Sequence, residues 1–111
     1  SKGKTAKEIK QLINDALLLQ KNGVFAIVLE CIKTPIAKQI TKNLSIPTIG
    51  IGSSVHCDGQ VLVTDDLIGL NQTNIKFVKK FLNVKKYINR GLRKFASQVK
   101  SKKFPTKKHS Y

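Results

Sequence analysis

The residues of this chain that could do chemistry gather where two apolar segments end. Residues 25–29 form an unbroken apolar run that stops at Glu30, and residues 48–52 lead into Ser53 and Ser54. A continuous apolar run is typical of a strand buried on both faces in a parallel sheet. A carboxylate at the end of such a strand lies in the loop layer that carries the chemistry of α/β folds. Glu30 is therefore the first catalytic candidate, and the alternative is a surface carboxylate that pairs with a lysine.

The glycine-rich residues 50–54 could instead suggest a phosphate-binding loop. Val55 stands where a third glycine is needed, and no Gly-Lys-Ser/Thr follows. A tight turn at the edge of the sheet is the favoured interpretation.

The remaining polar residues near these segments give weak indications of a metal. Asp58, Asp65 and Asp66 could be ligands, but loop carboxylates are more commonly caps and turn residues. His56 stands beside Cys57 without the second pair of ligands that a zinc site needs. We assign no metal ligand and no cofactor-binding residue in this chain.

The elements that must position Glu30 follow a strand–helix–strand order. Thr34 and Pro35 open the predicted helix, Thr as a cap and Pro in the first turn. The two predicted strands start about 23 residues apart, which is typical of one βαβ unit with parallel strands. Two strands alone do not form a stable sheet, so we expect further strands from a partner or from a larger domain.

Helices are predicted on either side of this unit. Thr5 and Glu8 form a capping box for a helix that ends at Lys21, before Asn22-Gly23. Residues 61–63 could be a short strand or a helix start, and residues 64–66 a turn or a helix cap. Apolar residues recur at helical spacing over residues 75–82 and again over residues 87–99.

Composition limits the classes of partner. The 111 residues suit one domain, and the net charge of +15 arises from 21 Lys and Arg against 6 Asp and Glu. Such a charge could indicate RNA binding. Because only two basic residues are Arg, the charge is equally explained by AT-rich codons, and we expect no nucleic acid partner. No apolar run reaches the length of a transmembrane helix, and two cysteines without a CxxC motif suit reduced thiols in the cytoplasm.

Several segments together resemble a known family. They are GKT at residues 3–5, VLECI at 28–32, IPTIGIG at 46–52, CDGQVLVTDDLIGL at 57–70, KFVKKF at 76–81 and FPTKKHSY at 104–111. This pattern is similar to the C-terminal half of ketopantoate hydroxymethyltransferase. The resemblance implies an α/β fold, the C-terminal part of a (β/α)₈ TIM barrel with extra C-terminal helices. Residues 1–111 are then one partial domain holding the last two barrel strands, and the N-terminal half of the barrel is absent.

The resemblance also implies an activity. The family transfers a hydroxymethyl group from 5,10-methylenetetrahydrofolate to 3-methyl-2-oxobutanoate, giving ketopantoate for pantothenate biosynthesis. By resemblance, Glu30 is the catalytic base that removes the C3 proton of the keto acid. Mg²⁺ binds the keto acid, and its ligands are expected in the absent N-terminal half. The family forms homo-oligomers, commonly decamers.

Two departures from the family pattern concern the segments around Glu30. Lys33 stands where the family usually has a proline, and Ser53 and Ser54 replace the alanine and glycine of IGIGAG. Two other hypotheses stay open at this point. The chain could be a non-catalytic truncated remnant of such an enzyme, or a basic RNA-binding α/β module.

Overall fold

The computed structural model describes all 111 residues, which divide into two compact units. The first unit contains residues 1–62 and 75–78, and the second contains residues 63–74 and 79–111.

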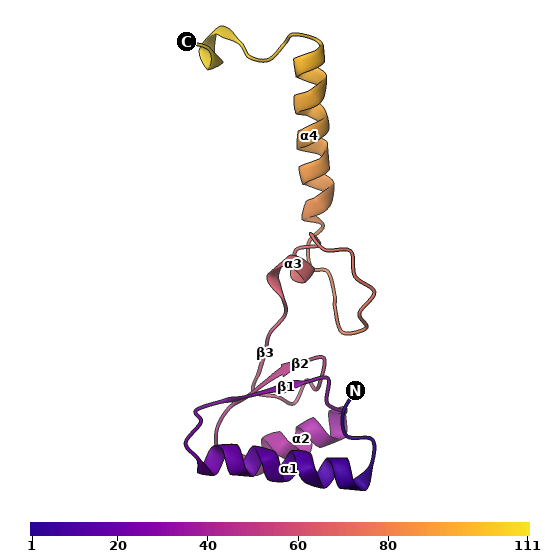
Figure 1. Ribbon diagram of the computed structural model, residues 1–111, viewed down its shortest axis with the longest axis vertical. Coiled ribbons are helices and arrows are strands. Elements are labelled where there is room, and N and C mark those ends of the chain that lie inside the picture. Colours follow the sequence, from indigo (N-terminus) through magenta and orange to yellow (C-terminus); the bar gives the residue numbers. More distant parts are fainter. The chain divides into compact units, whose positions relative to one another are not determined.

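The first unit is an α/β unit with a parallel sheet. Its elements are, in order, α1 (Ala6–Lys21), β1 (Ile27–Glu30), α2 (Thr34–Asn43), β2 (Thr48–Ile51) and β3 (Gly59–Gln60). The sheet order is β1-β2-β3, and both pairs of neighbours are parallel. The predicted βαβ unit is confirmed, with α2 as its crossover helix (Figure 1).

Local signals in the sequence account for the limits of α1. The Thr5 hydroxyl accepts a hydrogen bond from the Glu8 amide at 3.1 Å, which confirms the predicted cap. The Glu8 carboxylate accepts from the amide of Lys4 at 2.7 Å, one residue before the cap. At the other end the helix stops at Lys21, and Gly23 takes the left-handed conformation with φ +89°.

The start of α2 differs from the prediction. Thr34 was expected to cap this helix, but the cap position is Lys33 and no side chain caps it. The Thr34 hydroxyl instead donates to the main-chain oxygen of Ser53 at 3.0 Å. The capping role is therefore wrong, because Thr34 already lies inside the first turn and its hydroxyl joins α2 to the loop after β2.

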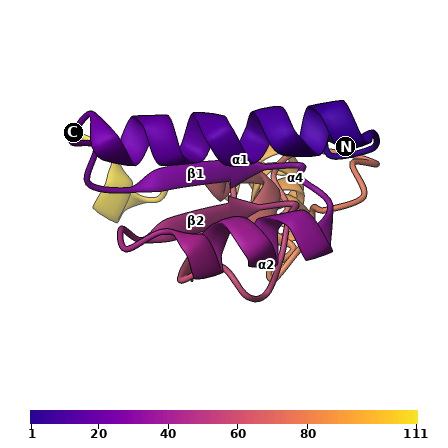
Figure 2. The same cartoon turned by 90° about the horizontal axis from the view of Figure 1, so that it is seen from below.

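Both helices of the first unit lie on the same side of the sheet (Figures 1 and 2). The core is formed by side chains from α1, α2 and β1 and from two loops: Ala16, Leu29, Ile32, Ala37, Ile40 and Cys57. Side chains alternate along a strand, so Val28 points away from Leu29 and this core, and Val28 is 60% exposed. Within residues 1–111 only one face of β1 is covered and β1 lies at an edge of the sheet, whereas the sequence predicted a strand covered on both faces, with further strands from a partner or a larger domain.

The connection from β2 to β3 is unusually short for parallel strands. Gly59 pairs with Ile49, so the chain returns to the start of β2 within residues 52–58, whereas parallel strands commonly need a dozen or more residues between them. The Asp58 carboxylate receives hydrogen bonds from the amide and hydroxyl of Thr48, at 2.9 and 3.3 Å. The third strand thus begins two residues before residues 61–63, where a strand or a helix start was expected.

The second unit contains α3 (Thr64–Leu67), α4 (Val84–Lys100) and the 3₁₀ helix η1 (Lys107–His109). The predicted last helix is confirmed as α4. The helix predicted over residues 75–82 is wrong. The amides of Phe81 and Leu82 donate to the Leu67 oxygen at 2.8 and 3.2 Å, so these groups bond to the end of α3.

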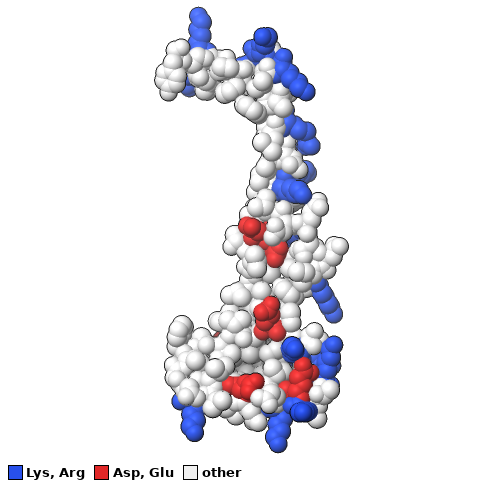
Figure 3. All heavy atoms as spheres, viewed as in Figure 1, with Lys and Arg blue, Asp and Glu red and all other residues white.

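The surface of α4 is strongly two-sided. Its apolar stripe consists of residues spaced three or four apart, all 44–61% exposed: Ile88, Leu92, Phe95 and Val99. Figure 3 shows Lys and Arg side chains along the opposite side of this helix. None of the helices combines the length and apolar character that crossing a membrane requires.

We predict that Asp58→Ala lowers the free energy of unfolding by about 1–3 kcal/mol, because the buried Thr48 amide loses its acceptor. Asp58→Asn keeps an oxygen acceptor and should lose less. Urea unfolding followed by circular dichroism measures both variants. Equal losses in the two variants would contradict the acceptor role.

A pH effect is predicted at the start of α1. The Lys4 amide donates to the Glu8 carboxylate and holds the pKa of Glu8 below its ordinary value of 4.5. A lowered pKa stabilises the folded chain above pH 4.5, and this contribution disappears as the pH falls through the folded-state value. Glu8→Gln should therefore lower the melting temperature at neutral pH and have a smaller effect in strong acid. A difference in melting temperature between wild type and Glu8→Gln that stays constant from neutral pH to strong acid would refute this prediction.

Candidate active site

Glu30 lies at the C-terminal end of β1, where it pairs with Ile51 of β2. Its side chain is exposed, and alternation along the strand places it on the same face as Val28, away from the helices. The structure therefore places Glu30 at the strand end where the sequence predicted it. On the face that carries Glu30, Val28 is exposed, whereas Ile49 and Ile51 are half-buried.

The turn that follows Glu30 has a specific backbone conformation. The Cys31 amide donates to the Ile51 oxygen at 2.9 Å and extends the strand pairing by one residue. Cys31 has φ +54°, a left-handed conformation that non-glycine residues rarely adopt. Lys2 runs beside this turn: its amide donates to the Cys31 oxygen at 2.8 Å, and its oxygen accepts from the Lys33 amide at 2.9 Å.

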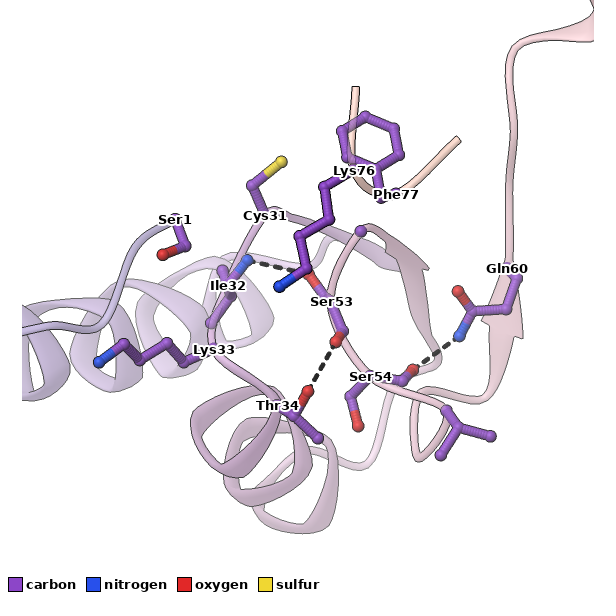
Figure 4. A pocket seen from close by; sticks show the side chains of 12 residues that line it. Ser1, Cys31, Ile32, Lys33, Thr34, Ser53, Ser54, Gln60, Lys76 and Phe77 are labelled. Carbon is purple, nitrogen blue, oxygen red and sulfur yellow. Dashed lines mark hydrogen bonds between the residues drawn. The ribbon is translucent and has the colours of Figure 1, made fainter. Parts of the chain in front are cut away.

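Ser53 joins this turn to the loop after β2 (Figure 4). Its hydroxyl donates to the Leu29 oxygen at 2.7 Å and accepts from the Ile32 amide at 3.0 Å. Its main-chain oxygen accepts from the Thr34 hydroxyl at 3.0 Å. The sequence drew attention to Ser53 only as a departure from a family pattern, and its contacts with the residues around Glu30 were missed.

Ser54 organises the short loop itself. This buried hydroxyl accepts from the His56 amide at 3.1 Å, and the Ser54 main-chain oxygen accepts from the Gln60 side chain at 2.7 Å (Figure 4). The positive φ of this turn falls on Gly52, at +61°, and not on Ser54. Serine at position 54 therefore needs none of the conformational freedom that glycine offers.

The glycines of residues 50–54 do not form an open cradle. A Cβ atom at Gly52 would lie 2.6 Å from the Phe77 ring, and one at Gly50 would lie 3.0 Å from the Cys57 sulfur and the Gln60 amide. Because side chains of the chain itself fill the space over both glycines, a tight turn remains the better interpretation than a phosphate loop.

A pocket of about 900 Å³ opens beside these loops in the first unit. The residues that line it include Lys33, Thr34, Ser53, Lys76 and Phe77 (Figure 4). Glu30 is not among its lining residues. The two lysine ammonium groups suit an anionic molecule. The Thr34 and Ser53 hydroxyls already donate to main-chain oxygens.

The other polar candidates are dispersed. Asp58 bonds to Thr48 at the start of β2, whereas Glu30 lies at the end of the neighbouring strand. Asp65 and Asp66 belong to the second unit, where the Asp66 carboxylate accepts from the side-chain amide of Asn71 at 3.2 Å. Within residues 1–111 no three His, Cys, Asp or Glu side chains lie together as a metal site would require. Cys31 and Cys57 are free thiols.

Comparison with known proteins identifies the family. A family model described as ketopantoate hydroxymethyltransferase matches residues 1–107. The chain belongs to this family. The resemblance seen in the sequence is thereby confirmed, and the parallel sheet with helices on one face is consistent with a fragment of an enzyme of this family.

Curated relatives carry the same description. The chain is 58% identical over 110 residues to the 3-methyl-2-oxobutanoate hydroxymethyltransferase of Pelagibacter ubique, covering 99% of the chain and 43% of the relative. It is 46% identical to that of Francisella tularensis (98% and 42% covered) and 44% identical to that of Carboxydothermus hydrogenoformans (98% and 40% covered). The chain thus spans about two fifths of the length of these relatives.

We predict that Gly52→Ala is more destabilising than Gly23→Ala. Both glycines have positive φ, so each alanine costs about 1–2 kcal/mol of backbone strain. Only at Gly52 does the new methyl group also collide with Phe77, which adds about 1–3 kcal/mol, since nothing lies within 4 Å at Gly23. Urea midpoints of the two variants test this, and equal midpoints would show that Phe77 does not pack on Gly52.

Proposed function

We propose that this chain is part of an enzyme that transfers a hydroxymethyl group from 5,10-methylenetetrahydrofolate to 3-methyl-2-oxobutanoate, giving ketopantoate in pantothenate biosynthesis. Membership of the family supports the reaction class. The observation that carries the proposal is the position of Glu30, an exposed carboxylate at the C-terminal end of a parallel strand. Catalytic groups of α/β barrels occupy this end of their strands.

We propose further that the first unit's sheet is part of a (β/α)₈ barrel and that residues 1–111 form one partial domain of it. The helices cover one face of the sheet only, as the outer layer of a barrel does. Val28, Ile49 and Ile51 lie on the opposite face by strand alternation and register, so that face is apolar. Strands supplied from outside these residues would bury it.

Glu30 is proposed as the base that removes the C3 proton of the keto acid. A carboxylate removes a proton from carbon only when it is held within reach of it, and a strand end gives such a fixed position. The proton moves to a Glu30 carboxylate oxygen, and the electron pair left on the substrate forms the enolate. This nucleophile then takes up the one-carbon unit.

As the resemblance implies, we propose that the reaction uses Mg²⁺, which when bound would supply Lewis-acid stabilisation of the substrate oxygen. The side chains of residues 1–111 do not fit a site for this ion, since no three potential ligands lie together. We therefore assign none of them as a ligand. Binding of the ion is proposed for residues of the complete enzyme outside this chain.

The exposed stripe of α4 supports a proposal about assembly. Ile88, Leu92 and Phe95 would be buried if copies of the chain packed along this helix, as in the family's homo-oligomers. The basic side of α4 would then face the solvent (Figure 3), and no nucleic acid is proposed as a partner. We propose the cytoplasm as the compartment of this metabolic enzyme.

We predict that Glu30→Gln in the complete enzyme slows exchange of the C3 proton of 3-methyl-2-oxobutanoate with solvent deuterium by about 10²–10⁴-fold. Glutamine has nearly the same size and cannot accept the proton. Proton NMR of the keto acid in deuterium oxide measures the rate.

Glu8→Gln is the matched control, because Glu8 is the only other glutamate of the chain and its carboxylate accepts from the Lys4 amide at the start of α1, far from this strand end in sequence. It should leave the exchange rate unchanged. Undiminished exchange in a folded Glu30→Gln enzyme would remove Glu30 from the mechanism.

A further inference from the structure

We infer that Ser53 is a positioning residue for Glu30, which it holds through the backbone on both sides of that residue. The inference rests on the proposed function of Glu30 as the base. Ser53 comes from the loop after β2, and its hydroxyl bonds to Leu29 and Ile32 of the neighbouring segment. Figure 4 shows the bond to Ile32.

The Ser53 hydroxyl bonds to the main chain on both sides of Glu30 in the sequence. Leu29 directly precedes Glu30, and Ile32 follows it by two residues. One oxygen atom thus donates to the main chain before Glu30 and accepts from the main chain after Cys31, at 2.7 and 3.0 Å. A change in the distance between these two bonded groups would turn the Glu30 Cα–Cβ bond.

In this chain the Ser53 hydroxyl restrains the turn at Cys31. A non-glycine residue at φ +54° is less stable than the same residue in an ordinary conformation, and it persists only where neighbouring contacts determine it. The Lys2 amide holds the Cys31 oxygen from one direction, and Ser53 holds the two flanking groups from another. Loss of the Ser53 hydroxyl would free the turn to relax and would displace the Glu30 carboxylate.

Ser53 is itself fixed in place. The Thr34 hydroxyl donates to its main-chain oxygen at 3.0 Å and so ties it to the first turn of α2. The preceding residue, Gly52, lies against the Phe77 ring. The hydroxyl therefore projects from a loop restrained on both sides, as a positioning group must.

Serine at this position is a departure from the IGIGAG pattern of the family, in which alanine precedes the last glycine. The Ser53 contacts therefore belong to chains with serine here and not to the pattern as such. Because alanine stands at this place in that pattern, Ser53→Ala is expected to fold, and its kinetics can be measured.

The test uses three variants of the complete enzyme. Ser53→Ala should lower kcat and the C3 exchange rate by about 10–100-fold, with KM unchanged, because a displaced base impairs the chemical step and not binding. Ser53→Thr keeps the hydroxyl and should restore at least half of the wild-type rate. Ser45→Ala removes a serine hydroxyl that bonds to Gln20 before β2, and it should leave both rates unchanged.

Thr34→Val provides an independent measurement, because it removes only the bond that fixes the Ser53 main chain. It should slow exchange several-fold. Wild-type exchange in Ser53→Ala, or failure of Ser53→Thr to restore the rate, would overturn the inference. A raised KM with unchanged kcat in Ser53→Ala would also overturn it, since Ser53 would then bind substrate.

The outcomes separate this inference from the proposed function. If Glu30→Gln abolishes exchange while Ser53→Ala does not slow it, the base is confirmed and only the positioning role fails. If Glu30→Gln leaves exchange unchanged, the proposed function of Glu30 fails whatever the serine variants show.

Discussion

The parallel pairing of β1 with β2 determines where each part of the candidate site lies. The register aligns Glu30 with Ile51, and the Cys31 amide continues the ladder by donating to the Ile51 oxygen. Two residues beyond Ile51 the chain reaches Ser53, at the level of Ile32. A shift of the register by one residue would turn Glu30 toward the helices and move Ser53 away from the turn. The βαβ crossover prevents that shift, because α2 must bury Ala37 and Ile40 against the same face.

The two ends of β2 serve different purposes. At its start, the Thr48 hydroxyl lies 2.8 Å from the Thr41 hydroxyl, and the Asp58 carboxylate accepts a hydrogen bond from the Thr48 amide. These bonds hold the short connection between β2 and β3 in place and so stabilise the fold. At its end, Ser53 is bonded to the backbone around Glu30. Parallel α/β folds commonly separate stability and chemistry in this way, and here one four-residue strand connects the two.

Sequence reasoning succeeded where local signals decide the structure. Apolar runs, Gly23 and the cap at Thr5 gave the βαβ unit, the ends of α1 and the place of Glu30. It failed where a polar group has a partner distant in sequence. Thr34 was expected to cap its own helix, and it bonds to Ser53, 19 residues away. The amides of residues 81 and 82 bond to Leu67, so an apolar pattern with helical spacing forms no helix there. No local pattern identifies such partners.

The uncovered face of the sheet connects folding with the proposed chemistry. Val28 is 60% exposed at an edge strand, and the same face carries Glu30. In the proposed barrel, the strands that remove the Val28 side chain from water also remove water from around the Glu30 carboxylate. Electrostatic interactions of that carboxylate with the substrate become stronger when water is excluded. In that barrel, the strands that complete the sheet also exclude water from the base. The restraint by Ser53 matters most there, because no water is present to carry the proton to a displaced Glu30 carboxylate.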